Sequence, residues 1–422
     1  MKRQKEFIVN GQSYIFDGNS VSIITDKNQI ANCNLSYKNP NSQRSATLKT
    51  LCLVTNNSCN LCCDYCFANK GKYDKPNEFM TLDTSKKSID FLVKSAIDNN
   101  NTKITIAFFG GEPLLNFSLI KKSVEYTECF KNINCNYMLT TNGTLLTPEI
   151  VSFLQYYRFD IMISIDGNEQ LHNFYRRYKS GKGSYKDVVN GIGLFNKKLF
   201  LNARITINNN NPEIHLYIDN ILELGFKRIT FAVDYNISEK NFYLFVESLK
   251  KLIEKYYNDI LLEKFYDITN FSSVITTLAL HQRKLTFCNA GISYITVSAD
   301  GKYYRCPRFV GNKEFVLDTI DETNKVKENI KKFKISLKNE PGERNTECRS
   351  CVYSFICGGM CYHHAVMKGK NEFENVPREC YQRKVLFDEI IEMICKLPTE
   401  KRRKLLLFYT NLWNTMKGGK TS

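Results

Sequence analysis

The sequence lacks any long apolar run, and none reaches the roughly 18 uninterrupted apolar residues that a membrane-spanning helix needs. Its N-terminus also lacks the charged, apolar and small-residue succession of a secretory signal peptide. We therefore expect no membrane span and no secretion, and we predict a cytoplasmic protein. Internal repeats and low-complexity segments are absent too. The 422 residues are enough for two or three domains.

Cysteine, in contrast, is abundant, with 16 residues in the chain. Because the cytoplasm keeps thiols reduced, clustered cysteines there predict metal binding or catalysis rather than disulfides. We expect the scattered cysteines to be small buried hydrophobic residues, namely Cys33, Cys52, Cys129, Cys135 and Cys395. The cysteines near residue 60 and those beyond residue 287 therefore need a chemical explanation.

The charge is strongly unbalanced, because 59 Lys and Arg residues outnumber 43 Asp and Glu residues and leave a formal net charge of +16. Such a basic chain raises the question of nucleic acid binding. Lysine is spread along the whole chain, however, and the densest basic run, KRRK at 401–404, lies in a predicted C-terminal helix. We do not expect a nucleic acid partner. An acidic peptide or protein partner fits the charge, and so does a solvated lysine-rich surface.

From residue 50 onward, apolar strand-like runs alternate with amphipathic helical stretches. This alternation predicts an α/β fold in which helices cover a parallel sheet. The predicted strands are 51–55, 103–109, 135–141, 160–166, 202–207 and 228–233, and the helices that follow them lie near 83–98, 117–131, 148–157, 185–198, 213–224 and 239–264. Six such units fall short of the eight in a complete TIM barrel, so we predict a partial (β/α)6 barrel.

The barrel is one of five segments that we expect along the chain. Residues 1–47 carry turn signals between short strands, which predicts an edge ribbon or a small peptide-docking element. The barrel covers 48–265, and a connector covers 266–287. Residues 288–395 lack the strand–helix alternation and are loop-rich, with one predicted hairpin in ISYITVSADGKYYRC. A segment with so little regular structure needs a bound metal or another covalent cross-link to fold stably. Residues 396–422 predict a basic helix with a frayed GGK tail.

The first cysteine cluster, CNLCCDYC, follows the first barrel strand and places Cys59, Cys63 and Cys66 at the spacing C-x3-C-x2-C. Three thiolates on one short loop suit a cubane iron–sulfur cluster and leave its fourth iron open to a small molecule. The alternative is a zinc loop, which needs a fourth ligand nearby. We assign Cys62 to packing.

With Tyr65 before its last cysteine, this motif resembles the cluster motif of radical S-adenosylmethionine (radical SAM) enzymes. FFGGEP (108–113), TTNGTLL (140–146) and SIDG (164–167) end the next three strands, as in that family. The resemblance implies that one 4Fe–4S cluster binds S-adenosylmethionine and, once reduced by a flavodoxin or ferredoxin, yields a 5′-deoxyadenosyl radical that abstracts a substrate hydrogen. It also implies these cofactor-binding residues: Tyr65, Gly110, Gly111, Glu112, Pro113, Asn142, Ser164, Asp166 and Arg204.

The later part of the chain contains the motif Gly301-x4-Cys306 and, from Cys348 to Cys361, the motif C-x2-C-x5-C-x3-C. Cys288 precedes the first motif, and Cys380 follows the second. These cysteines resemble the seven-cysteine SPASM domain, which carries two auxiliary clusters, so the chain is expected to hold three 4Fe–4S clusters. The resemblance gives the first auxiliary cluster Cys288, Cys306 and Cys361, and the second Cys348, Cys351, Cys357 and Cys380. The alternative is two structural zinc sites. Some relatives have an eighth cysteine at the position of Tyr294.

Two subfamilies compete for the function. Anaerobic sulfatase maturases, which form formylglycine, carry an Asp where this chain has Pro307. RCPRFVGNKEF (305–315), GGEPLLNFSLI (110–120) and CFANKGKYD (66–74) resemble SCIFF-type maturases, which link a peptide Cys to a carbon atom. We therefore predict a radical SAM peptide maturase that forms a Cys thioether or a related cross-link in a precursor peptide with a leader. If the basic surface of the chain binds this leader, the leader is expected to be acidic.

A peptide epimerase or dehydrogenase also fits these motifs, and a zinc-stapled binding protein without catalysis is a hypothesis from another class. The histidines offer further bases or ligands, although a lone histidine is more often a hydrogen-bonded packing residue; they are His172, His215, His281, His363 and His364.

Overall fold

The structure is a computed structural model that describes residues 3–24, 47–73, 77–196, 201–337 and 341–418. Cys33, most of the second half of the predicted 1–47 segment and the last residues of the GGK tail lie outside the described residues.

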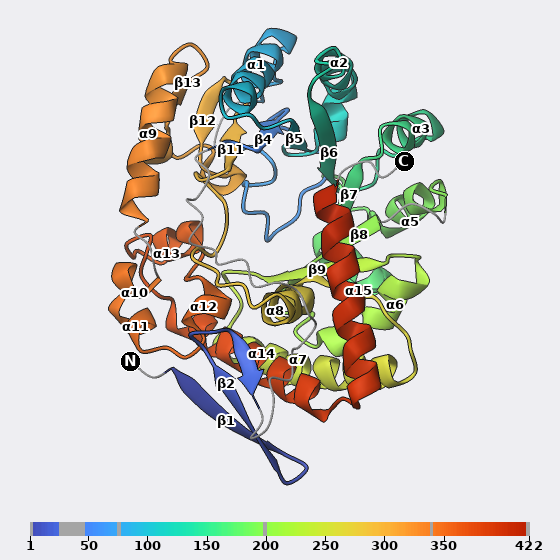
Figure 1. The fold of residues 1–422 in the computed structure, drawn as a ribbon. Coiled ribbons are helices and arrows are strands. Elements are labelled where there is room, and N and C mark those ends of the chain that lie inside the picture. Colours follow the sequence, from blue (N-terminus) through green and yellow to red (C-terminus); the bar gives the residue numbers. More distant parts are fainter. Residues whose placement is uncertain (1–2, 25–46, 74–76, 197–200, 338–340, 419–422) are drawn as a thin grey trace.

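A ten-stranded sheet forms the centre of the molecule, with the strand order β10-β9-β8-β7-β6-β5-β4-β11-β12-β13 (Figure 1). Strands β4 to β9 pair in parallel and in chain order, which confirms the α/β prediction and its six strands. They are β4 (Thr50–Val54), β5 (Lys103–Phe109), β6 (Asn134–Thr141), β7 (Asp160–Ser164), β8 (Leu201–Ile207) and β9 (Arg228–Val233). All six carboxyl ends therefore meet at one edge, where parallel sheets bind ligands.

The sheet extends beyond the six predicted strands at both sides. β10 (Asp267–Ile268) joins β9 in parallel, so the expected connector contributes a strand and the buried helix α8 (Thr269–Ala279). On the other side, β11 (Tyr294–Val297) pairs in parallel with β4, and β12 (Lys302–Tyr304) and β13 (Asp318–Thr319) follow in antiparallel pairing. The predicted hairpin thus continues the barrel sheet, which brings the cysteine-rich segment against the first barrel strand.

The helices of the barrel begin close to their predicted positions. They are α1 (Leu82–Asp98), α2 (Phe117–Thr127), α3 (Pro148–Tyr156), α5 (Tyr185–Gly193), α6 (Ile218–Glu223) and α7 (Glu239–Leu261). Side-chain caps explain several starts: Thr81 accepts from the third residue of α1's first turn, and Thr147 caps α3, whose first residue is a proline. The short helix α4 (Glu169–Tyr175) was not predicted.

The segment 288–395 contains more helix than its loop-rich prediction. α9 (Thr323–Ser336) and α14 (Pro377–Lys396) are long helices with buried apolar faces, and α14 packs against α7. Between them lie the short helices α10 (Pro341–Arg344), α11 (Thr346–Arg349), α12 (Ser354–Cys357) and α13 (Tyr362–Met367). The basic C-terminal helix is α15 (Thr399–Gly418), which packs against α8 (Figure 1).

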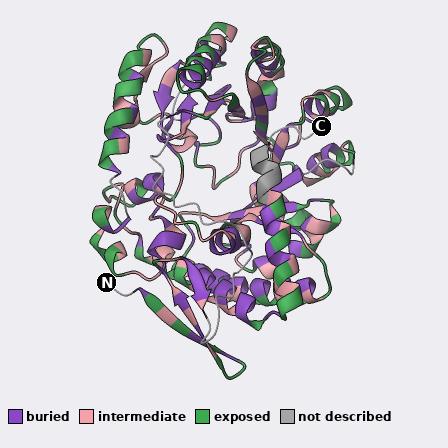
Figure 2. Cartoon of the chain, viewed as in Figure 1, coloured by how far each residue is buried: buried purple, intermediate pink, exposed green. Residues whose placement is uncertain are grey.

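The N-terminal strands β1 (Gln4–Val9), β2 (Gln12–Asp17) and β3 (Ser22–Ile24) form a separate antiparallel sheet. This sheet packs against the cysteine-rich segment, and Figure 2 shows its alternating buried and exposed residues. Arg3 donates to the carbonyl oxygen of Arg349, and Phe16 stacks on Tyr353 at 5.8 Å. The N-terminal sheet therefore supports the chain that carries Cys348 and Cys351. No helix among the described residues is long and apolar enough to cross a bilayer.

Candidate functional site

Three predicted site residues, Cys59, Cys63 and Cys66, lie on the loop after β4, at the carboxyl edge of the parallel sheet. All three are half-buried. Burial raises the pKa of the Cys59 thiol to about 12 and that of Cys63 to about 11, and the charge of a neighbouring thiolate also raises each pKa. Thiols of this kind lose their protons when a metal binds them.

The donor set and the shape of this loop fit a cluster. The amide of Leu61 donates to the Cys59 sulfur at 3.4 Å, and Asn142 Nδ2 lies 3.8 Å from the same sulfur. No group of three or more His, Cys, Asp or Glu side chains in the described ranges is arranged to hold a metal ion. In an iron–sulfur cluster, each thiolate binds its own iron, so the cysteines need not converge on one point.

Glycines allow the strand ends to approach closely. A Cβ on Gly111 would overlap the carbonyl oxygen of Ser58, and a Cβ on Gly71 would lie 2.7 Å from Cys59 Cβ. Gly71 also has a φ of +84°, which favours glycine. Tyr73 donates to the carbonyl oxygen of Gly110 at 3.2 Å. The cysteine loop is therefore clamped against Gly110 and Gly111, and their backbone lies beside Cys59.

Glu112 ties the ends of β5 and β6 together. Its buried carboxylate accepts hydrogen bonds from Thr141 Oγ1 at 2.7 Å and from the amides of Asn142 at 2.7 Å and Leu114 at 3.0 Å. Burial raises the pKa of Glu112 to about 7, although these three hydrogen bonds oppose the rise. Both oxygens are thus used within the protein, and Pro113 starts the short 3-10 helix η1 (Pro113–Asn116).

Asp166, at the end of β7, is the centre of a buried ion-pair network. It accepts from Arg176 Nε at 2.8 Å, from the amide of Thr206 at 2.8 Å and from the hydroxyl of Tyr65. The backbone amide of Asp166 lies 3.4 Å from His172 Nδ1. Tyr65 stands between two predicted cluster cysteines, so this network attaches the cysteine loop to strands β7 and β8.

Arg176, which follows the unpredicted helix α4, is a site residue that no sequence motif marks. The charge of Asp166 raises the pKa of Arg176 against the opposing effect of burial. Removing one partner of a buried ion pair costs about 3–5 kcal/mol, because the other charge is left unpaired. The neighbouring residues reinforce the attachment, since the amide of Cys62 donates to the carbonyl oxygen of Arg177 at 2.7 Å and Leu61 forms a β-bridge with Tyr178.

Ser164 and Arg204 are paired neighbours on β7 and β8. Burial, together with the positive charges of Arg308 and Arg176, lowers the pKa of Arg204 to about 10. Arg204 has no ion pair with an acidic residue within the described ranges. This guanidinium therefore lies at the carboxyl edge of the sheet, where Asp166 opposes the fall in its pKa without forming an ion pair with it.

The seven later cysteines fall into two groups, and all are half-buried. Burial raises the pKa values of Cys288 and Cys306, and the charge of Cys361 adds to the rise in both. These three thiols are therefore near one another and form one group. The other group consists of Cys348, Cys351, Cys357 and Cys380. The charge of Cys357 contributes to raising the pKa of each of the other three thiols. Arg383 Nη1 donates a hydrogen bond to the Cys357 sulfur at 3.3 Å. The grouping is the one that the family resemblance implies, and the ligand roles remain a proposal.

Tyr294 occupies the position of the eighth cysteine of some relatives. Burial raises the pKa of the Tyr294 phenol, and the charges of the nearby thiols Cys52 and Cys306 add to the rise. The first group therefore has three thiols and a neighbouring phenol.

A small apolar cluster joins the first barrel loop to the cysteine-rich segment. Its buried members include Tyr73, Phe309 and Val310, and Cys66, Cys288 and Cys306 pack against it. A Cβ on Gly311 would overlap the carbonyl oxygen of Tyr73. The thiol of Cys66 and two thiols of the first later group therefore share one hydrophobic support.

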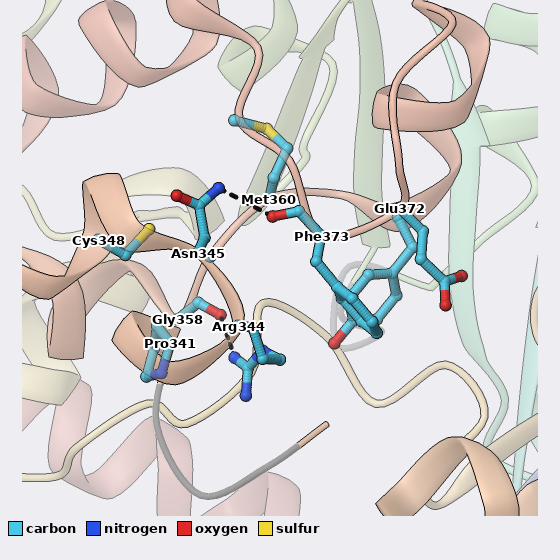
Figure 3. A pocket seen from close by; sticks show the side chains of 10 residues that line it. Pro341, Arg344, Asn345, Cys348, Gly358, Met360, Glu372 and Phe373 are labelled. Atoms are coloured by element: carbon cyan, nitrogen blue, oxygen red, sulfur yellow. Dashed lines mark hydrogen bonds between the residues drawn. The ribbon is translucent and has the colours of Figure 1, made fainter. Parts of the chain in front are cut away.

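A pocket lies elsewhere, beside the second group of cysteines (Figure 3). Asn345 donates to the carbonyl oxygen of Phe373 at 3.0 Å across it, and Cys348 forms part of its wall. Its lining includes no residue from the carboxyl ends of the barrel strands, so it is distinct from the site at β4 to β8.

The histidines mostly have packing partners. His172 is buried, and Ser184 Oγ lies 3.0 Å from its Nε2. His215 contacts Ser248, and His281 contacts the carbonyl oxygen of Val21. His363 and His364 lie beside the ring of Tyr235, and His364 also contacts Glu379.

Comparison with known proteins now identifies the family. Residues 53–213 match the model of the radical SAM superfamily. An uncharacterized protein of Methanocaldococcus jannaschii is 31% identical over 287 residues, which are 66% of this chain and 91% of that protein. The chain belongs to the radical SAM superfamily. It is therefore a radical SAM enzyme, and membership implies a 4Fe–4S cluster and S-adenosylmethionine as cofactors.

Other relatives are maturases and synthases. The radical SAM cyclopropyl synthase TigE of Paramaledivibacter caminithermalis is 25% identical over 82% of this chain and 74% of its own length. A cysteine-type anaerobic sulfatase-maturating enzyme of Clostridium novyi is 26% identical over 75% of this chain and 88% of its own. The solved structure of anSMEcpe with bound AdoMet and Cp18Cys peptide aligns with a TM-score of 0.69 at 23% identity, covering 86% of this chain and 99% of that one.

Proposed function

We propose that this radical SAM enzyme modifies a ribosomally made precursor peptide and joins a cysteine sulfur to a carbon atom of another residue. The observation that carries the proposal is the three-thiol group of Cys288, Cys306 and Cys361. Two of its members, Cys288 and Cys306, share an apolar support with Cys66. A group with only three protein thiols leaves room for a fourth from a substrate cysteine.

The chain's own residues have distinct tasks in this proposal. Cys59, Cys63 and Cys66 hold the radical-forming cluster, which together with S-adenosylmethionine supplies a 5′-deoxyadenosyl radical when bound. The backbone at Gly110 and Gly111 and the side chains of Ser164, Asn142 and Arg204 bind the cofactor, and Asp166 holds Tyr65 and Arg176 in place. The two later groups of cysteines hold auxiliary 4Fe–4S clusters, and a low-potential flavodoxin or ferredoxin supplies electrons.

A second candidate is the formylglycine-forming activity of the sulfatase-maturating relatives. Their similarity extends over about three quarters of this chain, and the solved anSMEcpe structure holds a bound Cp18Cys peptide. Pro307 stands directly after Cys306, however, and a proline side chain has no group that accepts a proton. This residue favours the thioether reaction.

The experiment that tests the proposal is anaerobic co-expression of the chain with small cysteine-containing reading frames that neighbour its gene, followed by peptide mass spectrometry. We expect the loss of two hydrogen atoms per link, together with protection of that cysteine from alkylation. The control is the chain with Cys59, Cys63 and Cys66 replaced by alanine.

The remaining outcomes separate the competing reactions. Loss of two hydrogens with an alkylatable cysteine would indicate a carbon–carbon link or a dehydrogenation, and loss of the thiol with gain of a carbonyl would indicate formylglycine. An unchanged mass that rises by one deuterium in heavy water would indicate an epimerase. Each of these results would contradict thioether formation.

A further inference from the structure

Arg308 lies where three parts of the molecule meet. Its Nη1 donates to the hydroxyl of Tyr235, just after β9, at 2.9 Å. Its guanidinium lies over the ring of Phe67, directly after the last cysteine of the first loop, at 4.7 Å from the ring centroid. Arg308 itself follows Cys306 by two residues. It therefore links the first cysteine loop, the barrel edge and the first later group of thiols.

Arg308 forms no ion pair with an Asp or Glu side chain among the residues that the structure describes. The buried arginines Arg176, Arg228 and Arg305 pair with the carboxylates of Asp166, Asp267 and Glu372, whereas Arg308 is half-buried. Within the described ranges, neither Arg308 nor Arg204 has such an ion pair. The two guanidiniums are close enough for Arg308 to lower the pKa of Arg204, after burial.

Two unpaired guanidiniums in proximity repel one another, and an anion near them removes that cost. Arginine binds carboxylates through two parallel hydrogen bonds, which makes a carboxylate the fitting ligand class. Tyr235 holds Arg308 by a hydrogen bond, and its ring stacks on His364 at 4.0 Å. Phe67 remains 41% exposed, so the ring under Arg308 is accessible from solvent.

We propose that Arg308 binds a carboxylate of the peptide substrate, the side chain of an Asp or Glu residue, between the first cysteine loop and Cys306. The proposal rests on the peptide function above and names a substrate class, a peptide that combines a cysteine with an acidic residue. Arg204 remains the residue assigned to the carboxylate of S-adenosylmethionine, so the two arginines have different carboxylates as ligands.

The test uses the reconstituted holoenzyme and two fluorescent pools of synthetic peptides. Every peptide has one cysteine, and one pool has Asp where the matched pool has Asn, with randomised residues elsewhere. Equilibrium binding of both pools is measured in the presence of S-adenosylmethionine, for the wild type, Arg308→Lys and Arg308→Gln. We expect wild-type binding of the Asp pool to be at least about tenfold tighter, the range of one charge-assisted hydrogen bond.

Arg308→Gln should bind both pools equally, and Arg308→Lys should keep part of the preference. The matched control is Arg378→Gln, because Arg378 also combines a hydrogen bond, to the carbonyl oxygen of Ile237 at 3.1 Å, with a ring contact, to Phe242 at 4.8 Å. The control should keep the full preference. The ratio of the two affinities is taken within each protein, so a partly unfolded variant does not imitate the expected result.

Three results would overturn the assignment: equal binding of the two pools by the wild type, no binding of either pool, and an undiminished preference in Arg308→Gln. In a further outcome, Arg308→Gln would bind S-adenosylmethionine more weakly but keep the peptide preference. That result would assign the carboxylate of the cofactor to Arg308 and would also contradict the proposal. Peptide modification is not part of this readout. A clear acidic preference without any modification would therefore contradict only the thioether function.

Discussion

Replacing Cys59, Cys63 and Cys66 together by alanine should abolish reductive cleavage of S-adenosylmethionine. The three thiols are the only proposed ligands of the cluster that receives the cofactor, and their loop lies against Gly111 and Asn142. Without them the cluster has no donors on this loop. The measurement is 5′-deoxyadenosine formed from S-adenosylmethionine and dithionite under anaerobic conditions, together with the iron content of the purified protein.

The matched control for this variant is Cys62→Ala, which removes a thiol from the same loop. Cys62 contributes a backbone hydrogen bond to Arg177, and alanine preserves that bond, so its cleavage rate should equal that of the wild type. Cleavage retained by the triple variant would contradict the assignment of the loop. Loss of cleavage in Cys62→Ala would show that the ligand set includes a fourth cysteine.

Replacing Cys288, Cys306 and Cys361 by alanine should separate cofactor cleavage from peptide modification. These thiols lie in one group, and the cofactor residues on β5 to β8 are outside it. We expect cleavage of S-adenosylmethionine to keep at least about a tenth of its rate, a change of ~1.4 kcal/mol or less in the barrier, while cross-linked peptide becomes undetectable. Both products are measured in the same anaerobic reaction by mass spectrometry.

The comparison for this second variant is Cys395→Ala, because Cys395 is a buried cysteine in α14 outside both groups. That protein should form cross-linked peptide at the wild-type rate after correction for its folded fraction. Cross-linking by the variant that lacks the first group would contradict a role for those thiols in the reaction. An equal loss of cleavage and cross-linking would indicate that the group only supports the fold.

The sequence predicted the barrel well because its signal is local. Each of the six parallel strands is a short apolar run followed by an amphipathic helix, so the alternation is visible within about 30 residues. The pairing of β11 with β4 is not visible in this way, because it joins Tyr294 to Thr50 across most of the chain. α9 did carry a readable signal, since its buried residues Val326, Ile330 and Phe333 have helical spacing.

The site shows the same division. The cysteines and the glycine-containing strand ends are contiguous motifs, and the structure brings their residues to one edge of the sheet. Arg176 and Arg308 were missed because their meaning depends on distant partners, Asp166 and Tyr65 for the first and Tyr235 and Phe67 for the second. The donors that bind the Glu112 carboxylate, Thr141 and the amide of Asn142, are likewise revealed only by the folded chain.

The most direct test of the account follows a hydrogen atom from peptide to cofactor. A precursor peptide with perdeuterated residues is incubated anaerobically with the reconstituted wild-type protein, S-adenosylmethionine and dithionite, and the mass of the 5′-deoxyadenosine is measured. The account predicts that 5′-deoxyadenosine gains one deuterium in proportion to the peptide modified. Modified peptide accompanied by unlabelled 5′-deoxyadenosine would contradict hydrogen abstraction from the peptide, which is the central claim.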